Sequence, residues 1–245
     1  MSWQIDYLLF LQNFRELTNG FLDAFFLLIS QLGVAPFTMI AVCVIYWGIN
    51  KRLGVFMLYC GCFSYLMNML LKFSFCIYRP WLLDSKIHPC ESAFITAPGY
   101  SFPSGHTSGA LAFWGAIGMY FKNKKWVIYS CLVMIFLVMF SRNYLCVHTS
   151  QDVIVSFIIG IFILFFVQKL LNRIDEKTYS DIAVLVINTI LCMGIGLYIV
   201  LKTYPADYIN GVLIYNPQEA VYDALSRIFY VFAIFLGCFL ERRYI

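Results

Sequence analysis

Long apolar runs without charges restrict this chain more than any other feature of its sequence. A helix that spans a bilayer needs about 20 mostly apolar residues, and every backbone polar group inside the lipid has to bond within its own segment. Only 12% of the residues are charged and 62% are hydrophobic, which excludes an ordinary soluble domain. We therefore expect an all-α fold, a polytopic transmembrane helical bundle of about six or seven spans. The runs lie at residues 34–49, 53–71, 105–121, 126–141, 153–168, 182–201 and 220–240.

The amino-terminal segment, residues 3–31, is apolar but carries Arg15, Glu16 and Asp23. Each of these charges would cost about 2.5–3.5 kcal/mol at the centre of a bilayer. We therefore expect an amphipathic segment that is interfacial or re-entrant. The start of the chain lacks a basic region and a small-residue cleavage site, so we expect no removable signal peptide.

The basic residues between the apolar runs divide into two groups, and the positive-inside rule assigns the larger group to the cytoplasm. The carboxyl terminus is then inside and the amino-terminal segment outside. Because these charges are spread over short loops and form no single face, we expect no nucleic-acid partner. The larger group, ten of the 17 basic residues, comprises Lys51, Arg52, Lys122, Lys124, Lys125, Lys169, Arg173, Lys177, Arg242 and Arg243. The opposite group comprises Arg15, Lys72, Arg79, Lys86, Arg142, Lys202 and Arg227.

The remaining composition predicts one membrane domain over residues 1–245 without a bound cofactor. No linker, low-complexity tract or fixed-period repeat interrupts the chain. The nine cysteines lack the spacing of metal-binding pairs, and most fall inside apolar runs, where they are expected to pack as small hydrophobic residues. No carboxylate cluster suited to magnesium is present, so we expect no metal.

Three polar segments fall on the predicted non-cytoplasmic side. They are KFSFCIYRP (residues 72–80), GYSFPSGHTSG (residues 99–109) and SRNYLCVHTSQD (residues 141–152). Ionisable groups at a membrane edge are candidates for function because they are costly to keep there. Lys72, Arg79 and Arg142 would concentrate positive charge and hydrogen-bond donors, which suits a phosphate oxyanion.

The PSGH sequence at residues 103–106 predicts a phosphate cradle. Pro103 favours the first turn of a helix, and the Ser104 hydroxyl and the Gly105 amide can donate hydrogen bonds. The positive end of the following helix dipole would also face the anion.

The histidines of these segments suit two different roles. His148 and Asp152 stand four residues apart, so they share one face if a helix begins near residue 148. The carboxylate then orients the imidazole, whose other nitrogen is free to attack phosphorus. His106 is left to protonate the leaving oxygen.

The order K-x6-RP, PSGH and SR-x5-H-x3-D resembles the complete three-part signature of the type 2 phosphatidic acid phosphatase superfamily. The resemblance implies a metal-independent phosphomonoester or diphosphate hydrolase that passes through a phosphohistidine on His148. It also implies that His106 is the acid and later the base, and that Asp152 orients His148. The phosphate-binding residues that it implies are Lys72, Arg79, Ser104, Gly105 and Arg142.

The resemblance places a catalytic core at about residues 50–170. The helical hairpin at about residues 182–240, with the tyrosine-rich outer loop TYPADYINGVLIYNPQEAVYD, is extra to the six-span core usual for bacterial members. Outside the signature, His88 is expected to be an exposed loop residue, Asp223 and Arg227 a structural pair, and Trp81 an interfacial anchor.

The leading hypothesis is a membrane phosphatase for a lipid phosphate or diphosphate, such as undecaprenyl pyrophosphate or phosphatidic acid, with membrane lipids around it. One alternative is a phosphatase or phosphotransferase for a soluble phosphoester. Another is a non-catalytic protein for lipid binding or transport. The charge asymmetry fits a bacterial cell membrane with an outward site, and equally an endoplasmic reticulum membrane with a lumenal site.

Overall fold

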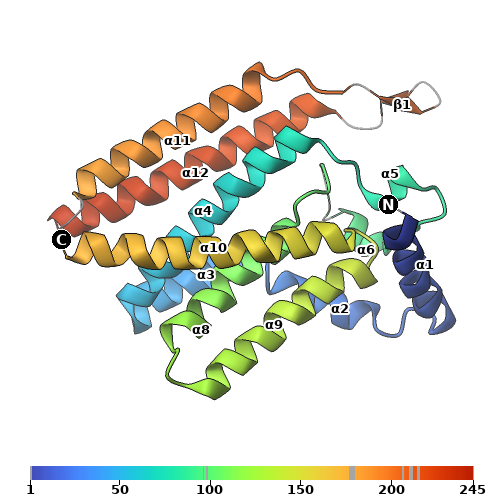
Figure 1. The fold of residues 1–245 in the computed structure, drawn as a ribbon, viewed down its shortest axis with the longest axis horizontal. Coiled ribbons are helices and arrows are strands. Elements are labelled where there is room, and N and C mark those ends of the chain that lie inside the picture. Colours follow the sequence, from blue (N-terminus) through green and yellow to red (C-terminus); the bar gives the residue numbers. More distant parts are fainter. Residues whose placement is uncertain are drawn as a thin grey trace.

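The computed structural model describes residues 2–95, 97, 99–176, 180–205, 207–209, 212–213 and 216–244. Over these residues the protein is an elongated bundle of helices whose two chain ends point to opposite ends of the long axis (Figure 1). Five helices in this part of the chain are long and apolar enough to cross a membrane. They are built on α4 (Lys51–Phe75), α9 (Lys125–Tyr144), α10 (Ser150–Asp175), α11 (Asp181–Leu201) and α12 (Pro217–Tyr244).

A sixth candidate crossing, either a broken span or a re-entrant loop, is formed by two helical stretches that meet at a bend of 48°. The first is α2 (Asp23–Gln31), and the second is α3 (Ala35–Val44) with its π-helical continuation η1 (Ile45–Ile49). The all-helical membrane bundle is thereby confirmed, with five to six candidate spans.

The span expected at residues 105–121 is interrupted. It consists of α7 (Gly105–Ala110), the π-helix η2 (Leu111–Gly115) and α8 (Ala116–Tyr120), which have six, five and five residues. Together they are shorter than the ~20 residues of a typical crossing. The stretch packs against α4, α9 and α10.

Short elements lie at the end of the bundle opposite the carboxyl terminus (Figure 1). They are α1 (Ser2–Leu17), α5 (Pro80–Leu83), α6 (Glu91–Ile95), β1 (Tyr208–Ile209) and β2 (Val212–Leu213). The strands pair antiparallel, with Tyr208 opposite Leu213. The all-α expectation did not include this small ribbon, which belongs to the loop between α11 and α12.

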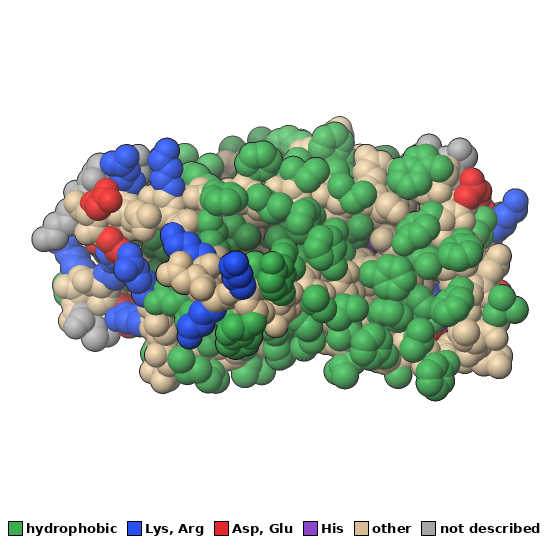
Figure 2. Space-filling model, turned by 60° about the horizontal axis from the view of Figure 1, so that its bottom comes forward, with side chains coloured by type: hydrophobic (Ala, Val, Ile, Leu, Met, Phe, Trp, Pro, Cys, Tyr) green, Lys and Arg blue, Asp and Glu red, His purple; other side chains and the backbone are tan. Residues whose placement is uncertain are grey.

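Ion pairs join α4 to α10 and α12 at the other end. Lys51 at the start of α4 pairs with Glu241 of α12 at 2.8 Å, and Arg52 pairs with Asp175 of α10 at 3.0 Å. On the face shown in Figure 2, Lys and Arg side chains gather at this end, while hydrophobic side chains cover the middle of the molecule. The bundle thus has the charge asymmetry that the sequence predicted, although Lys177 lies outside the described residues.

The amino-terminal segment, expected to be amphipathic and interfacial or re-entrant, consists of two helices, α1 and α2. α2 packs against α9, and Asp23 at its start accepts a hydrogen bond from the Tyr144 hydroxyl at 3.1 Å, so α2 belongs to the bundle. α1 crosses the end of the bundle (Figure 1). Its buried residues include the polar Gln4, Gln12 and Arg15 beside Leu8 and Leu11, and its exposed residues include the apolar Trp3, Phe10, Phe14 and Leu17 beside Asp6, Asn13 and Glu16. Exposed apolar and charged side chains together fit a helix that lies in the membrane interface.

Two glycines allow α7 to touch the bend between α2 and α3. A β-carbon added to Gly109 would lie 2.1 Å from the carbonyl oxygen of Gly33. One added to Gly33 would lie 2.6 Å from the carbonyl oxygen of His106. The indole nitrogen of Trp114 also donates to the carbonyl of Leu32 at 3.1 Å. This backbone contact brings the helix that carries His106 against the sixth candidate crossing.

We expect Gly109→Ala to destabilise the protein, because the added methyl group overlaps a backbone atom and overpacking costs about 1–3 kcal/mol. Gly194→Ala is the matched control: Gly194 is also inside a helix, and a β-carbon there meets no atom within 4 Å. The midpoint of thermal unfolding in detergent should fall for the first variant and stay level or rise for the second. Equal midpoints would contradict the close contact.

Candidate active site

The three polar segments meet at the end of the bundle that carries α1. Lys72 lies in the last turn of α4, and Arg79 follows the left-handed residue Cys76 (φ 50°) that ends this helix. His106 lies in the first turn of α7. Arg142 lies in the last turn of α9, and His148 in the short connection between α9 and α10. The antiparallel order of these helices therefore gathers residues from distant parts of the chain.

His148 and Asp152 form a buried pair. The Nδ1 atom of His148 lies 3.2 Å from the Oδ2 atom of Asp152. The same oxygen accepts hydrogen bonds from the Ser101 hydroxyl at 2.6 Å and from the Thr149 amide at 2.8 Å. The carboxylate is thus fixed by three donors from two segments.

The tautomer of His148 follows from its two neighbours. The Nη1 atom of Arg79 lies 2.9 Å from the Nε2 atom of the imidazole. A guanidinium only donates and an ionised carboxylate only accepts, so Nε2 is the acceptor and Nδ1 carries the proton. The lone pair at Nε2 therefore points into the site, where Arg79 covers it. Arg79 also donates to the carbonyls of Val147 at 2.9 Å and Gly99 at 3.0 Å.

The pKa of His148 lies well below its ordinary value. Burial is the main cause, because it disfavours the charged imidazolium. The positive charges of Arg79 and Arg142 act in the same direction. The imidazole is therefore neutral near pH 7, as a nucleophile requires.

The reason given above for the His148 and Asp152 contact needs correction. α10 begins at Ser150, so His148 precedes the helix and does not share a helical face with Asp152. Thr149 is the N-cap, and it forms a capping box in which the Asp152 side chain turns back to the Thr149 amide. The carboxylate reaches His148 because it is folded back over the start of the helix.

The PSGH sequence lies between α4 and α10. Asn68 of α4 donates to the carbonyl of Pro103 at 3.3 Å, and the Ser104 amide donates to the carbonyl of Asp152 at 3.2 Å. Ser104 is the N-cap of α7, and its hydroxyl oxygen accepts from the Thr107 amide at 3.4 Å. Pro103 precedes the N-cap, so it lies outside the first turn in which we expected it. Phosphate binding by Ser104 and Gly105 stays a prediction.

Arg142 is fully buried without a partner for its charge. Its Nε, Nη1 and Nη2 atoms have no hydrogen-bond acceptor among the described residues, and its exposed fraction is 0%. The Nε2 atom of His106 is likewise buried without a partner in that part of the chain. His106 lies within electrostatic range of Arg142 and His148. These two side chains supply donors and a proton-transfer group that no neighbour uses.

Lys72 completes the group of cations. Its Nζ atom donates to the carbonyls of Tyr100 at 2.7 Å and Ser101 at 3.3 Å. The Ser101 hydroxyl in turn donates to Asp152. Ser101 therefore connects Lys72 to the pair of His148 and Asp152. The structure thus brings the predicted site residues into one region, and their individual roles stay predictions.

Four polar residues of the site were missed by the sequence analysis. Ser101 and Thr149 hold Asp152, Asn68 holds the PSGH turn, and Asn143 donates to the carbonyl of His148 at 2.9 Å. Thr149-x-x-Asp152 is a capping-box pattern that was readable in the sequence. Asn68 and Asn143 were visible as amides in or beside apolar runs, whereas nothing local distinguishes Ser101.

Of the residues set aside in the sequence analysis, His88, Asp223 and Arg227 have no side-chain hydrogen bond or ion pair with this network within the described chain, whereas Trp81 contacts Arg79. His88 is exposed, and its backbone carbonyl accepts from Arg15 of α1 at 2.6 Å. Asp223 and Arg227 pair at 3.0 Å on α12. Trp81 lies 5.9 Å below the guanidinium of Arg79 and stacks near Phe94. Over the described residues, His, Cys, Asp and Glu side chains form no group of three suited to a metal ion.

Comparisons with known proteins agree with the geometry. The undecaprenyl-diphosphatase BcrC of Bacillus subtilis (strain 168) is 28% identical over 148 residues, which cover 59% of this chain and 72% of that protein. The phosphatidylglycerophosphatase B of the same organism is 29% identical over 109 residues, 41% of this chain and 51% of that protein. No solved structure matches significantly. The sequence profile of the PAP2 superfamily matches residues 53–176, about half of the chain and all three polar segments, and the protein therefore belongs to the PAP2 superfamily.

Proposed function

We propose that this PAP2-family protein is a membrane phosphatase that hydrolyses a lipid phosphate or diphosphate through a phosphohistidine on His148. The observation that carries the proposal is the buried guanidinium of Arg142, which has no hydrogen-bond acceptor among the described residues and lies within electrostatic range of the oriented imidazole of His148. Burying a charge without a partner costs several kcal/mol. A phosphoryl group that accepts from Arg142 would remove this cost, because planar guanidinium donors match phosphate oxygens.

The first step forms a bond between His148 and phosphorus. Phosphate oxygens accept from Arg142, Lys72 and Arg79, and the Nη1 donor of Arg79 moves from Nε2 of His148 to one of these oxygens. The freed Nε2 lone pair attacks phosphorus in line with the leaving oxygen, while Asp152 stabilises the Nδ1 proton. His106 gives its proton to the leaving oxygen as the ester or anhydride bond breaks.

The second step reverses the role of His106. His106, now neutral, takes a proton from a water molecule, and the oxygen of that water attacks the phosphohistidine. The phosphorus–nitrogen bond breaks, inorganic phosphate forms, and Nε2 regains its lone pair. Water is the only co-reactant that these two steps need.

A lipid substrate is supported by the surroundings of the site and by the names of the relatives. The exposed apolar side chains of α1 would hold this end of the bundle at the headgroup level. Both relatives are named for the hydrolysis of a lipid phosphate or diphosphate. The basic ends of the helices are assigned to the cytoplasm, so the site would face the outside of a bacterial cell membrane, or the lumen if the membrane is that of the endoplasmic reticulum.

The decisive experiment measures phosphate release by the purified protein from undecaprenyl diphosphate, phosphatidylglycerol phosphate, phosphatidic acid and a soluble sugar phosphate. We expect a lipid to be preferred in kcat/KM. His148→Ala should lower the rate about 10³-fold or more, because it removes the nucleophile. His88→Ala is the matched control, and the exposed loop position of His88 predicts an unchanged rate.

Two results would count against this function. A preference for the soluble ester would favour the alternative class of phosphatase or phosphotransferase. Absence of phosphate release from every substrate, with binding of the lipids intact, would favour a lipid-binding or transport protein.

The reaction should not depend on a divalent metal. Lys72, Arg79 and Arg142 would repel Mg²⁺, and the Oδ2 atom of Asp152 is already occupied by three donors. We expect full phosphate release in the presence of a chelator, and competitive inhibition by orthovanadate, an oxyanion that mimics the transferring group. A requirement for added Mg²⁺ would contradict the mechanism.

The lowered pKa of His148 predicts the acid side of the pH profile. Protonation of Nε2 abolishes its lone pair, and this protonation occurs below the ordinary histidine pKa of about 6.5. The loss of kcat/KM that reports protonation of His148 should therefore lie below about pH 6.5. The titration of the substrate phosphate is measured separately and divided out. A half-maximal loss at or above about pH 6.5 would mean that the imidazole is not shielded as described.

A further inference from the structure

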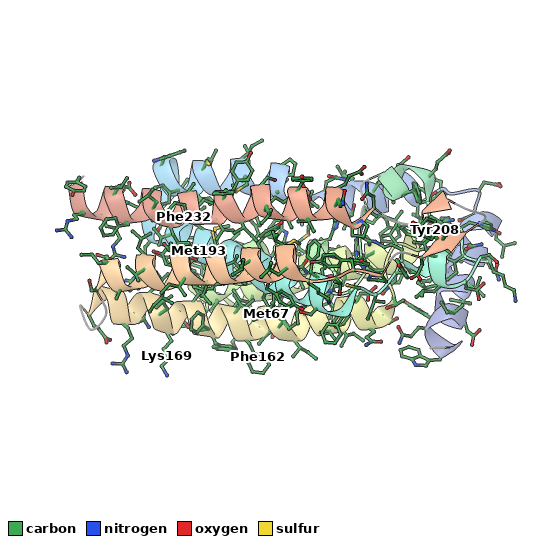
Figure 3. All side chains as sticks on the ribbon, turned by 90° about the horizontal axis from the view of Figure 1, so that it is seen from above. Met67, Phe162, Lys169, Met193, Tyr208 and Phe232 are labelled. Carbon is green, nitrogen blue, oxygen red and sulfur yellow. The ribbon has the colours of Figure 1, made fainter. Side chains whose placement is uncertain are left out.

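The C-terminal hairpin of α11 and α12 contacts the segment that joins Lys72 to Arg79. The family profile ends at residue 176, before either helix begins. Figure 3 shows α11 and α12 side by side along the bundle, with Tyr208 of their connecting loop beyond their ends. At that end, side chains of the hairpin reach the last turn of α4 and the residues after it.

Lys202, which ends α11, provides the main contact. Its Nζ atom donates to the carbonyl oxygens of Phe73 and Ser74, the latter at 2.7 Å, and lies 3.7 Å from the Sγ atom of Cys76. The last carbonyls of a helix have no partner within the helix, and a cation there also complements the negative end of the helix dipole. Lys202 thus completes the end of α4.

Two aromatic rings hold the ammonium group in place. The Nζ atom of Lys202 lies 5.9 Å from the ring centre of Tyr198 and 5.8 Å from that of Tyr204. The Tyr198 hydroxyl donates to the Ser74 hydroxyl at 3.1 Å, and the Tyr204 ring packs edge-on against Phe73 at 5.5 Å. Hairpin residues on both sides of Lys202 therefore grip the same turn of α4.

A separate contact holds the other end of the segment. The Tyr78 hydroxyl donates to the Oδ2 atom of Asp207 at 2.7 Å. Tyr78 directly precedes Arg79, and Phe73 directly follows Lys72. The hairpin is thus attached next to both cations that this segment contributes to the site.

We propose that Lys202 is a positioning residue, which holds the end of α4 so that Lys72 and Arg79 reach the phosphoryl group. The proposal rests on the phosphatase function proposed above. Lys202 itself donates to backbone carbonyls and acts through its neighbours. Displacing a binding group by about 1 Å can cost 10²-fold in rate. The contact of Lys202 with the end of α4 can therefore affect the site without touching the substrate.

The effect should fall on phosphate binding more than on the attack itself. Lys72 and Arg79 bind phosphate oxygens in the ground state as well as in the transition state, and loss of such uniform binding raises KM. His148, Asp152 and His106 come from α7, α10 and their connections, which the hairpin contacts at Lys202 and Asp207 do not include.

The test compares Lys202→Met with Lys169→Met. Both changes replace a lysine by an uncharged chain of similar length, but Lys169 is exposed on α10 and points away from the bundle (Figure 3). We expect Lys202→Met to raise KM and the orthovanadate Kd about tenfold, with kcat changed by less than about threefold. Lys202→Arg, which keeps donors and charge, should recover most of the affinity. Lys169→Met should match the unmodified protein.

A second measurement applies even without turnover. Hydrogen exchange of the amides of residues 73–79 should become faster in Lys202→Met and stay unchanged in Lys169→Met. If Lys202→Met does not fold, Tyr78→Phe, which removes one hydroxyl at the exposed contact with Asp207, should raise KM by a smaller factor.

The outcomes separate the two proposals. An active protein whose KM, vanadate Kd and hydrogen exchange are all unaffected by Lys202→Met overturns the positioning role and leaves the phosphatase function standing. A fall in kcat and thermal stability at unchanged KM and vanadate Kd also overturns it, since that pattern indicates a structural role alone. If the unmodified protein releases no phosphate, the proposed function fails, and hydrogen exchange and vanadate binding still decide whether Lys202 orders the segment.

Discussion

One carboxylate oxygen holds the site together. The Oδ2 atom of Asp152 accepts from Ser101, from the Thr149 amide and from His148. These donors connect the loop before α7 to the start of α10, two segments that apolar helix packing alone would leave free to slide. A buried carboxylate is costly unless its acceptor sites are satisfied. The hydrogen bonds that offset the cost of burying the Asp152 carboxylate also orient the imidazole of His148.

Placing Lys72, Arg79 and Arg142 close together costs free energy. Backbone carbonyls that accept from Lys72 and Arg79 offset this cost. Lys72 donates to Tyr100 and Ser101, and Arg79 donates to Gly99 and Val147. These carbonyls are available because the segments that bear them are irregular, with no helix to bond them internally. Arg142 differs, because none of its nitrogens has an acceptor within the described chain. Backbone carbonyls therefore accept from two of the three cations, and the third has no acceptor among the described residues.

Sequence reasoning predicted what depends on local pattern. Uncharged runs identified the membrane helices, and the three polar segments identified the residues that meet at the end of the bundle. It could not reveal tertiary packing: α4, α9 and α10 surround the stretch at 105–121, and the start of α2 is held by the bond between Asp23 and Tyr144. Contacts such as Lys202 with the end of α4 join residues about 130 apart in the chain, and no spacing rule reveals them.

α1 exposes apolar side chains at the end of the bundle that carries the site. Gln4, Gln12 and Arg15 face inward, where Gln4 donates to Gln151, the neighbour of Asp152, and Arg15 donates to His88. Trp3, Phe10 and Phe14 face outward, so the apolar surface continues from the sides of the bundle over part of one end. A detergent micelle or nanodisc that covers only the middle of the helical bundle would leave α1 in water. The amphiphile chosen for purification therefore bears on the site itself, because α1 is bonded to the loops that surround it.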